Sequence, residues 1–139
     1  MQTREQVYAA TIYGLVDQRR TNLAKEQQAK YGAMAHKLPV LIRSAGLAQA
    51  IEFVNTREKP DTHRDKHPNR DLLHDLQTAL RTTGSLKENQ SLRESSREAS
   101  LTEYMLLTEH ALAALLWFKR YAQSVLDVTA DASNEGGAP

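Results

Sequence analysis

Hydrophobic residues recur every three or four positions along most of the chain, and this spacing predicts helices. The first segment begins after Thr3, which forms a capping-box pattern with Gln6. The clearest segment begins after Ser100, where Glu103 completes a second such pattern. It carries two adjoining apolar stripes, so we expect a central helix with neighbours on several sides. The stripes are Tyr104, Leu107, Ala111, Leu115, Phe118, Ala122 and Val125, and Leu101, Met105, Leu112 and Leu116.

A second pattern runs over residues 23–45, although it contains a glycine and a proline. Its apolar positions keep one helical phase across Pro39, so we expect the helix to kink or restart near Leu38 rather than end there. Gly46 has the position of a left-handed C-cap, and a third helix is expected after it. The positions on this face of the second pattern, all apolar except Gln27, are Leu23, Gln27, Tyr31, Met34, Leu38, Leu41, Ile42 and Ala45.

The remaining segments are more polar. Residues 58–70 contain two prolines and no periodicity, which predicts a surface loop. Asn69 is the expected cap of a fourth helix that carries Leu72, Leu73, Leu76 and Leu80 and stops at Gly84. Residues 85–99 fit either a weak polar helix or a mobile connection, and residues 129–139 fit a disordered tail. The pattern thus predicts a single all-α domain over residues 1–128, a bundle of about five to six helices.

Composition supports this fold class. The chain has 139 residues, and its 18 Leu and 18 Ala stand against 9 Val plus Ile, the residues that favour strands. There is no cysteine, which excludes disulfides, thiolate zinc sites and cysteine nucleophiles. The N-terminus lacks the apolar core of a signal peptide, and no apolar run approaches the roughly 20 residues that span a bilayer. We therefore expect a soluble, cytoplasmic protein.

Charge is distributed unevenly. Residues 1–70 hold 12 Lys/Arg and 7 Asp/Glu, whereas residues 71–139 hold 6 and 10. The basic excess of the front half lies in one segment that contains a single acid, Glu26. A basic face of this kind would attract a polyanion, and the alternative is a solvated helix face that pairs with acids of the second half. The six cations are Arg19, Arg20, Lys25, Lys30, Lys37 and Arg43.

The helix face opposite the second apolar pattern consists mostly of small residues. Such a surface, bordered by cations, would let a phosphate backbone or another subunit approach closely. The alternative is a helix buried on both sides, in which the small residues are packing spacers. Tyr8, Tyr31 and Tyr104 lie on apolar stripes, so we expect them in the core. The residues of the small face are Ala29, Gly32, Ala33, His36, Val40 and Ser44.

Catalytic patterns are weak. His63 and His67 have metal-ligand spacing, and His74 with Asp75 resembles the doublet of metal-dependent phosphohydrolases. The first pair, however, falls in the proline-bordered loop, and adjacent helical residues do not point the same way. Nucleophile elbows and phosphate-binding glycine loops are absent from the sequence. We expect no enzyme, no cofactor, no metal and no small-molecule substrate.

Two blocks carry a family resemblance. The sequences "KYGAMAHKLPVLIRSAGLAQAIEFV", residues 30–54, and "YMLLTEHALAALLWFKRYAQSVL", residues 104–126, resemble the small α-helical subunit of type III-B (Cmr-type) CRISPR effector complexes. With the opening helix, they cover more than half of the chain. The run "KLPVLIRSAGLAQA" is the distinctive part, because any Leu/Ala-rich helix partly matches the second block. No family motif is assigned to residues 58–99.

The resemblance implies a non-catalytic structural subunit of a cytoplasmic antiviral ribonucleoprotein. Several copies would stack head-to-tail along a groove that holds guide RNA paired with target RNA, beside the other subunits of the complex. RNA backbone contacts would come from Lys30, Lys37 and Arg43, which lie inside the matching run. Lys25, Arg19 and Arg20 are added by charge and proximity. Two other hypotheses stay open: a phosphohydrolase using the histidine region, and a protein-only helical adaptor.

Overall fold

The computed structural model describes residues 1–58 and 66–130, and within these ranges the chain forms α-helices and no strand. The predicted all-α, single-domain fold is confirmed. The predicted loop lies largely outside the described residues, as do positions 131–139 of the predicted tail. The helices are α1 (Arg4–Asn22), α2 (Lys25–Ala45), α3 (Leu47–Arg57), α4 (Pro68–Thr82), α5 (Leu92–Glu98) and α6 (Leu101–Ser124).

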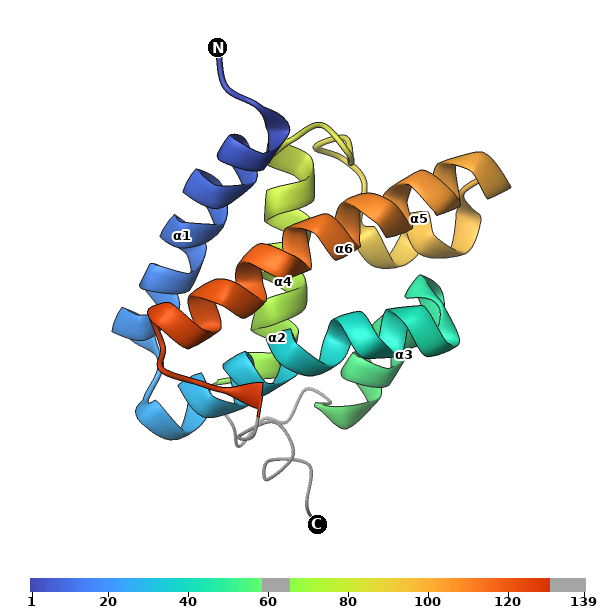
Figure 1. Cartoon of the computed structure of the whole chain (residues 1–139). Helices are drawn as coiled ribbons and strands as arrows, with labels where there is room; N and C mark the ends of the chain where they lie inside the picture. Colours follow the sequence, from blue (N-terminus) through green and yellow to red (C-terminus); the bar gives the residue numbers. More distant parts are fainter. Residues whose placement is uncertain (59–65, 131–139) are drawn as a thin grey trace.

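Helix α6 crosses the bundle and packs on α1, α2 and α4, as Figure 1 shows. Helix α1 lies on one side of it, and α2 with α3 lies on the other. The predicted core positions of α6 and the three tyrosines are buried or nearly so. The largest fully buried side chains come from five helices, which makes one shared core. They include Ile12, Tyr31, Leu38, Leu47, Leu72, Leu76, Leu80, Leu115 and Phe118.

Polar side chains begin the helices where the sequence indicates. The Thr3 hydroxyl accepts the Gln6 N–H, and the Gln6 side chain accepts the Thr3 N–H, which completes the predicted capping box of α1. Ser100 accepts the Glu103 N–H in the same way at the start of α6. Ser91 caps the short helix α5, so the ambiguous segment 85–99 is a turn followed by two helical turns. These caps satisfy N–H groups that have no partner inside the helix.

Helix α2 does not end at Pro39, as its unbroken phase indicates, and it forms one helix without the expected restart near Leu38. Its C-cap is Gly46, as predicted. The φ of Gly46 is positive, at +92°, but its ψ of 158° lies outside the left-handed helical region that was expected. A Cβ at Gly46 would lie 3.2 Å from the Tyr104 hydroxyl, which accepts the Ala48 N–H. The positive φ favours glycine here, and a side chain would also crowd the Tyr104 hydroxyl.

The small-residue face of α2 is partly buried, which decides between the two interpretations at its centre. Gly32 lies under Val128, and a Cβ there would be 2.6 Å from the Val128 Cβ. The ring of His36 is buried, and its Nε2 forms a hydrogen bond with the Val128 carbonyl at 2.9 Å. The segment after α6 thus covers this part of α2, which favours the alternative of a helix buried on both sides at these two positions. Val40 and Ser44 remain exposed.

Helix α4 begins two residues earlier than expected, so residues 68–70 are helical and do not belong to the predicted loop. His67 is its N-cap and Pro68 its first residue, so the prediction that Asn69 caps the helix is wrong. The capping acceptor comes from the end of α3 instead, because the Glu58 carboxylate accepts the N–H groups of Asn69 and Arg70 at 2.6 and 3.0 Å. A carboxylate at this end also suits the helix dipole.

Helix α6 has the expected neighbours on several sides, but its second apolar stripe is exposed. Leu101 is 75% exposed, Met105 59% and Leu116 49%, and Leu106 lies beside them at 51%. Only Leu112 of this stripe is partly buried. Among the residues that the structure describes, no helix combines the length and hydropathy needed to cross a membrane.

Candidate nucleic-acid interface

Arg19 forms a partly buried ion pair inside the bundle. Its Nε and Nη2 donate to the two oxygens of Asp75, both at 2.9 Å, and its side chain is only 17% exposed. The Tyr31 hydroxyl donates to the same carboxylate at 2.7 Å. This network joins α1, α2 and α4. A guanidinium held bidentately by a buried carboxylate is not available to a phosphate, so the geometry argues against Arg19 as an RNA contact.

The pKa values in this network follow from the contacts. The hydrogen bonds that Arg19 donates to Asp75 raise the pKa of Arg19, against the opposing effect of burial. Burial raises the pKa of Tyr31 well above its usual value, and the negative charge of Asp75 raises it further. Both shifts keep Arg19 charged and Tyr31 protonated. The carboxylate therefore keeps all three of its donors.

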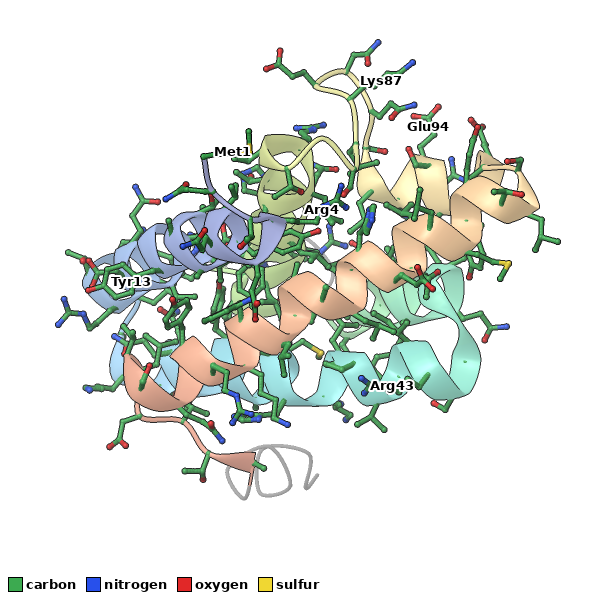
Figure 2. The ribbon with its side chains drawn as sticks, turned by 45° about the horizontal axis from the view of Figure 1, so that its top comes forward. Met1, Arg4, Tyr13, Arg43, Lys87 and Glu94 are labelled. Carbon is green, nitrogen blue, oxygen red and sulfur yellow. The ribbon has the colours of Figure 1, made fainter. Side chains whose placement is uncertain are left out.

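The other five candidate cations divide into three places. Arg20 lies on the surface of α1 and donates to Asp17 at 2.6 Å. Lys30 and Lys37, seven residues apart, project from α2 within about 20° of each other, whereas Lys25 and Arg43 project about 120° away. Figure 2 labels Arg43 near the end of α2. The six residues therefore do not form one basic face. Lys30 and Lys37 are the aligned pair that lies close together, about 10 Å apart along the axis, whereas Lys25 and Arg43 share a direction but are about 27 Å apart.

Lys30 is exposed and borders an open hollow of about 450 Å³. Lys66 lines the same hollow, as do Glu26 and Glu58. Of these two acids, Glu58 is already engaged in capping α4. The hollow is therefore of mixed charge and open to water, with Lys30 at its edge.

Lys37 lies at the contact between α2 and α3. Its Nζ is 5.4 Å from the centroid of the Phe53 ring, and the Arg57 guanidinium carbon is 5.7 Å from the same centroid. The ring is 36% exposed. Lys30, Lys37, Phe53 and Arg57 together are called the α2–α3 edge below. Sequence reasoning missed Phe53 and Arg57, although their four-residue spacing, off the buried stripe of α3, was a usable signal.

The acids of α3 and of its C-cap residue are engaged by other partners. Glu52 forms a bidentate ion pair with Arg93 of α5, which lowers the pKa of Glu52 through the hydrogen bonds from the guanidinium. Glu58 caps α4. Within residues 1–58 and 66–130, neither Lys37 nor Arg57 has a carboxylate partner. The edge therefore carries positive charge that the described part of the chain does not neutralise.

The histidine region does not assemble into a metal site within the described residues. Asp75 is occupied by Arg19 and Tyr31, and His74 is exposed on the surface of α4. His67 is the N-cap residue of α4, and His63 lies outside the described residues. Among the described positions, no group of three or more His, Asp or Glu side chains could hold a metal ion. The phosphohydrolase hypothesis is not favoured.

One serine–histidine contact also lacks the arrangement of a nucleophile. Ser85 Oγ lies 2.8 Å from His110 Nδ1, but the other ring nitrogen faces the Arg4 guanidinium. Burial, and then the charge of Arg4, lowers the pKa of His110. A cation in the place where a triad has its carboxylate disfavours the imidazolium that such a mechanism needs. The contact links α1, α6 and the turn after α4.

Comparison with known proteins gives one consistent match. Residues 4–125 fit the model of a family described as CRISPR-associated protein (Cas_Cmr5). The chain is 40% identical over 127 residues to the CRISPR system Cmr subunit Cmr5 of Thermus thermophilus, an alignment that covers 91% of this chain and 99% of that protein. The crystal structure of a CRISPR-associated Cmr5 family protein from the same organism superposes with a TM-score of 0.70 at 38% identity, covering 90% of this chain and 98% of the other.

Proposed function

We propose, since this chain belongs to the Cmr5 family of CRISPR-associated proteins, that it is a non-catalytic small subunit of a type III-B CRISPR ribonucleoprotein. Several copies would stack beside the other subunits along the groove that holds guide and target RNA, in the cytoplasm, as part of antiviral defence. Base pairing with the guide sets the sequence, so the small subunit needs to offer only shape and positive charge. Shape and charge are what the surface of α2 provides.

The observation that supports RNA contact is the alignment of Lys30 and Lys37 on one edge of α2. They are about 10 Å apart along the helix axis and point in nearly the same direction, so one strand can meet both. Lys25 and Arg43 form a second row on another side of α2, which is free to meet a different strand or a neighbouring copy. Arg19 is left out of the proposal, because its guanidinium is held by Asp75.

The observation that supports assembly is the apolar stripe of α6. Leu101, Met105, Leu106 and Leu116 are all about half exposed or more. Scattered exposed apolar residues are ordinary, but four on one helix favour a protein contact. We propose that another subunit of the complex covers this stripe. A subunit that contacts protein through α6 and RNA through α2 would bridge the two components.

The test uses the reconstituted effector complex with the double variant Lys30→Glu/Lys37→Glu. We expect normal folding and assembly but weaker retention of target RNA, because two phosphate contacts per copy become repulsive. The matched control is Lys25→Glu/Arg43→Glu, which makes the same charge change on the second row. If one copy makes about four phosphate contacts, log affinity falls with log salt at a slope near −3.

The result separates this function from a protein-only adaptor. Unchanged RNA retention in both double variants at low salt would remove RNA contact from the proposal and leave an adaptor that acts through α6. Loss of retention only in Lys25→Glu/Arg43→Glu would move the RNA to the second row. Loss in the Lys30→Glu/Lys37→Glu variant supports the proposal as stated.

A further inference from the structure

Phe53 stands out on α3 because an aromatic ring that is one-third exposed has two cations beside it. The Lys37 ammonium comes from α2, and the Arg57 guanidinium comes from the next turn of α3. Each lies within about 6 Å of the ring centroid, the range in which the ring quadrupole attracts a cation. The ring therefore contacts two long, flexible cationic side chains, one from each helix.

Because both cations lie over one ring, they are at most about 11 Å apart, and the described part of the molecule pairs neither of them with an acid. Glu52 pairs with Arg93 on the far flank of α3, and Glu58 accepts backbone N–H groups of α4. Within the described ranges, no acid forms an ion pair with Lys37 or Arg57. Two neighbouring cations without an acidic partner can bind an anion. A phosphate group is a suitable anion, because it accepts hydrogen bonds from both a guanidinium and an ammonium.

We propose that Lys37 and Arg57 form a phosphate clamp for an RNA strand, and that Phe53 is the positioning residue that holds the two cations in place. This inference rests on the proposed function, which it extends from α2 to α3. It adds Arg57 as a direct RNA contact. Phe53 acts through the cations and not by reading a base. The clamp continues the line of Lys30, because Glu58, the residue after Arg57, lines the hollow that Lys30 borders.

The residues of the clamp all belong to one chain, so the isolated protein binds RNA at low salt. The experiment measures fluorescence anisotropy of a labelled, about 20-nucleotide single-stranded RNA over a series of salt concentrations. Arg57→Gln removes one contact, and the salt slope becomes shallower by about 0.7 with a several-fold loss of affinity. The matched control is Arg120→Gln, an exposed arginine on α6 with no partner among the described residues, which leaves both values unchanged.

Phe53 is tested with a change that removes no charge. Phe53→Leu keeps the apolar packing but loses the ring, and affinity falls about three- to tenfold. Phe53→Tyr keeps a ring and restores binding. A thermal melt of each variant shows that the bundle is intact. A loss of binding in Phe53→Leu that Phe53→Tyr does not restore would assign the effect to packing and overturn the positioning role.

The outcomes also separate this inference from the proposed function. If Lys30→Glu weakens RNA binding while Arg57→Gln and Phe53→Leu do not, the α2 contact stands and the clamp is overturned. If none of the three variants changes binding, or if the wild-type chain does not bind RNA at low salt, the clamp is overturned. The proposed function is then tested only by the retention of target RNA in the reconstituted complex. Equal or tighter binding of a polyglutamate of similar length would assign the clamp to an acidic protein segment and overturn the RNA proposal.

Discussion

The buried network around Asp75 gives the sharpest stability prediction. Asp75→Ala removes a carboxylate that is 3% exposed and accepts two hydrogen bonds from Arg19 and one from Tyr31. Breaking a buried ion pair by deleting one partner costs about 3–5 kcal/mol, because the other charge loses its compensation. Asp71 lies 3.7 Å from the Arg19 guanidinium and offers partial replacement, so the lower end applies. We expect a loss of about 3 kcal/mol.

This loss is large enough to measure by thermal and urea unfolding followed by circular dichroism. For a chain of this length, about 3 kcal/mol lowers Tm by roughly 10 °C. The control is Asp17→Ala, which removes the same side chain from the exposed pair with Arg20 and changes stability by less than about 1 kcal/mol. RNA binding by folded Asp75→Ala protein stays unchanged, since Arg19 is not one of the proposed RNA contacts.

A double variant tests the reason for the loss. In Asp75→Ala the Tyr31 hydroxyl is left buried without an acceptor, a penalty of about 1–3 kcal/mol. Adding Tyr31→Phe removes that hydroxyl, so the double variant is less destabilised than the sum of the two single variants. Strict additivity, or a loss in Asp75→Ala no larger than in Asp17→Ala, would refute the network as a stabilising unit.

Two further predictions concern packing and pH. Gly32→Ala lowers the free energy of unfolding in urea by about 1–2 kcal/mol, because the added Cβ would lie 2.6 Å from Val128 and this overpacking outweighs the gain in helix propensity. Gly14→Ala has open space around the added Cβ, so it raises the free energy of unfolding by up to about 1 kcal/mol. An equal gain in both would contradict the close contact. His110 has a lowered pKa, so its contribution is present above about pH 6.5 and decreases as pH falls below that value. His110→Gln flattens this acid limb of stability, and an identical pH profile in the variant would refute it.

The helices were predictable because local chemistry determines them. The capping box at Thr3 and Gln6 and the buried stripe of α6 both depend on residues close in sequence. The unbroken apolar phase indicated that α2 does not end at Pro39, although it did not distinguish a kink or restart from the single helix that is observed. In each case the relevant neighbours lie within one or two helical turns, so the sequence alone carries the signal.

The errors arise where distant segments meet. Asp75 reaches Arg19 across 56 positions and Val128 covers His36 across 92, and neither pairing leaves a periodic trace. The cap of α4 comes from Glu58, on the far side of residues 59–65, whereas local spacing favours Asn69. The sequence alone shows the excess of cations in residues 19–43. It does not show which of these cations form ion pairs in the folded chain, because that depends on long-range contacts such as Arg19 with Asp75.

The exposed stripe of α6 could not be distinguished from a buried one by hydrophobicity. Leu101 and Leu116 have the same apolar character as the buried Leu107 and Leu115, and only the packing of α1, α2 and α4 separates them. A periodic pattern marks surfaces that avoid water, and these include contacts with other chains as well as the core.

Whether target RNA runs along the α2–α3 edge is decided by crosslinking RNA to protein in the assembled complex and mapping the modified peptides of this subunit. We expect modified peptides that contain Lys30, Lys37 or Arg57, and none from the α1 segment around Arg19. Crosslinks confined to α6, or a subunit that carries none while its neighbours are modified, would be incompatible with RNA on this edge.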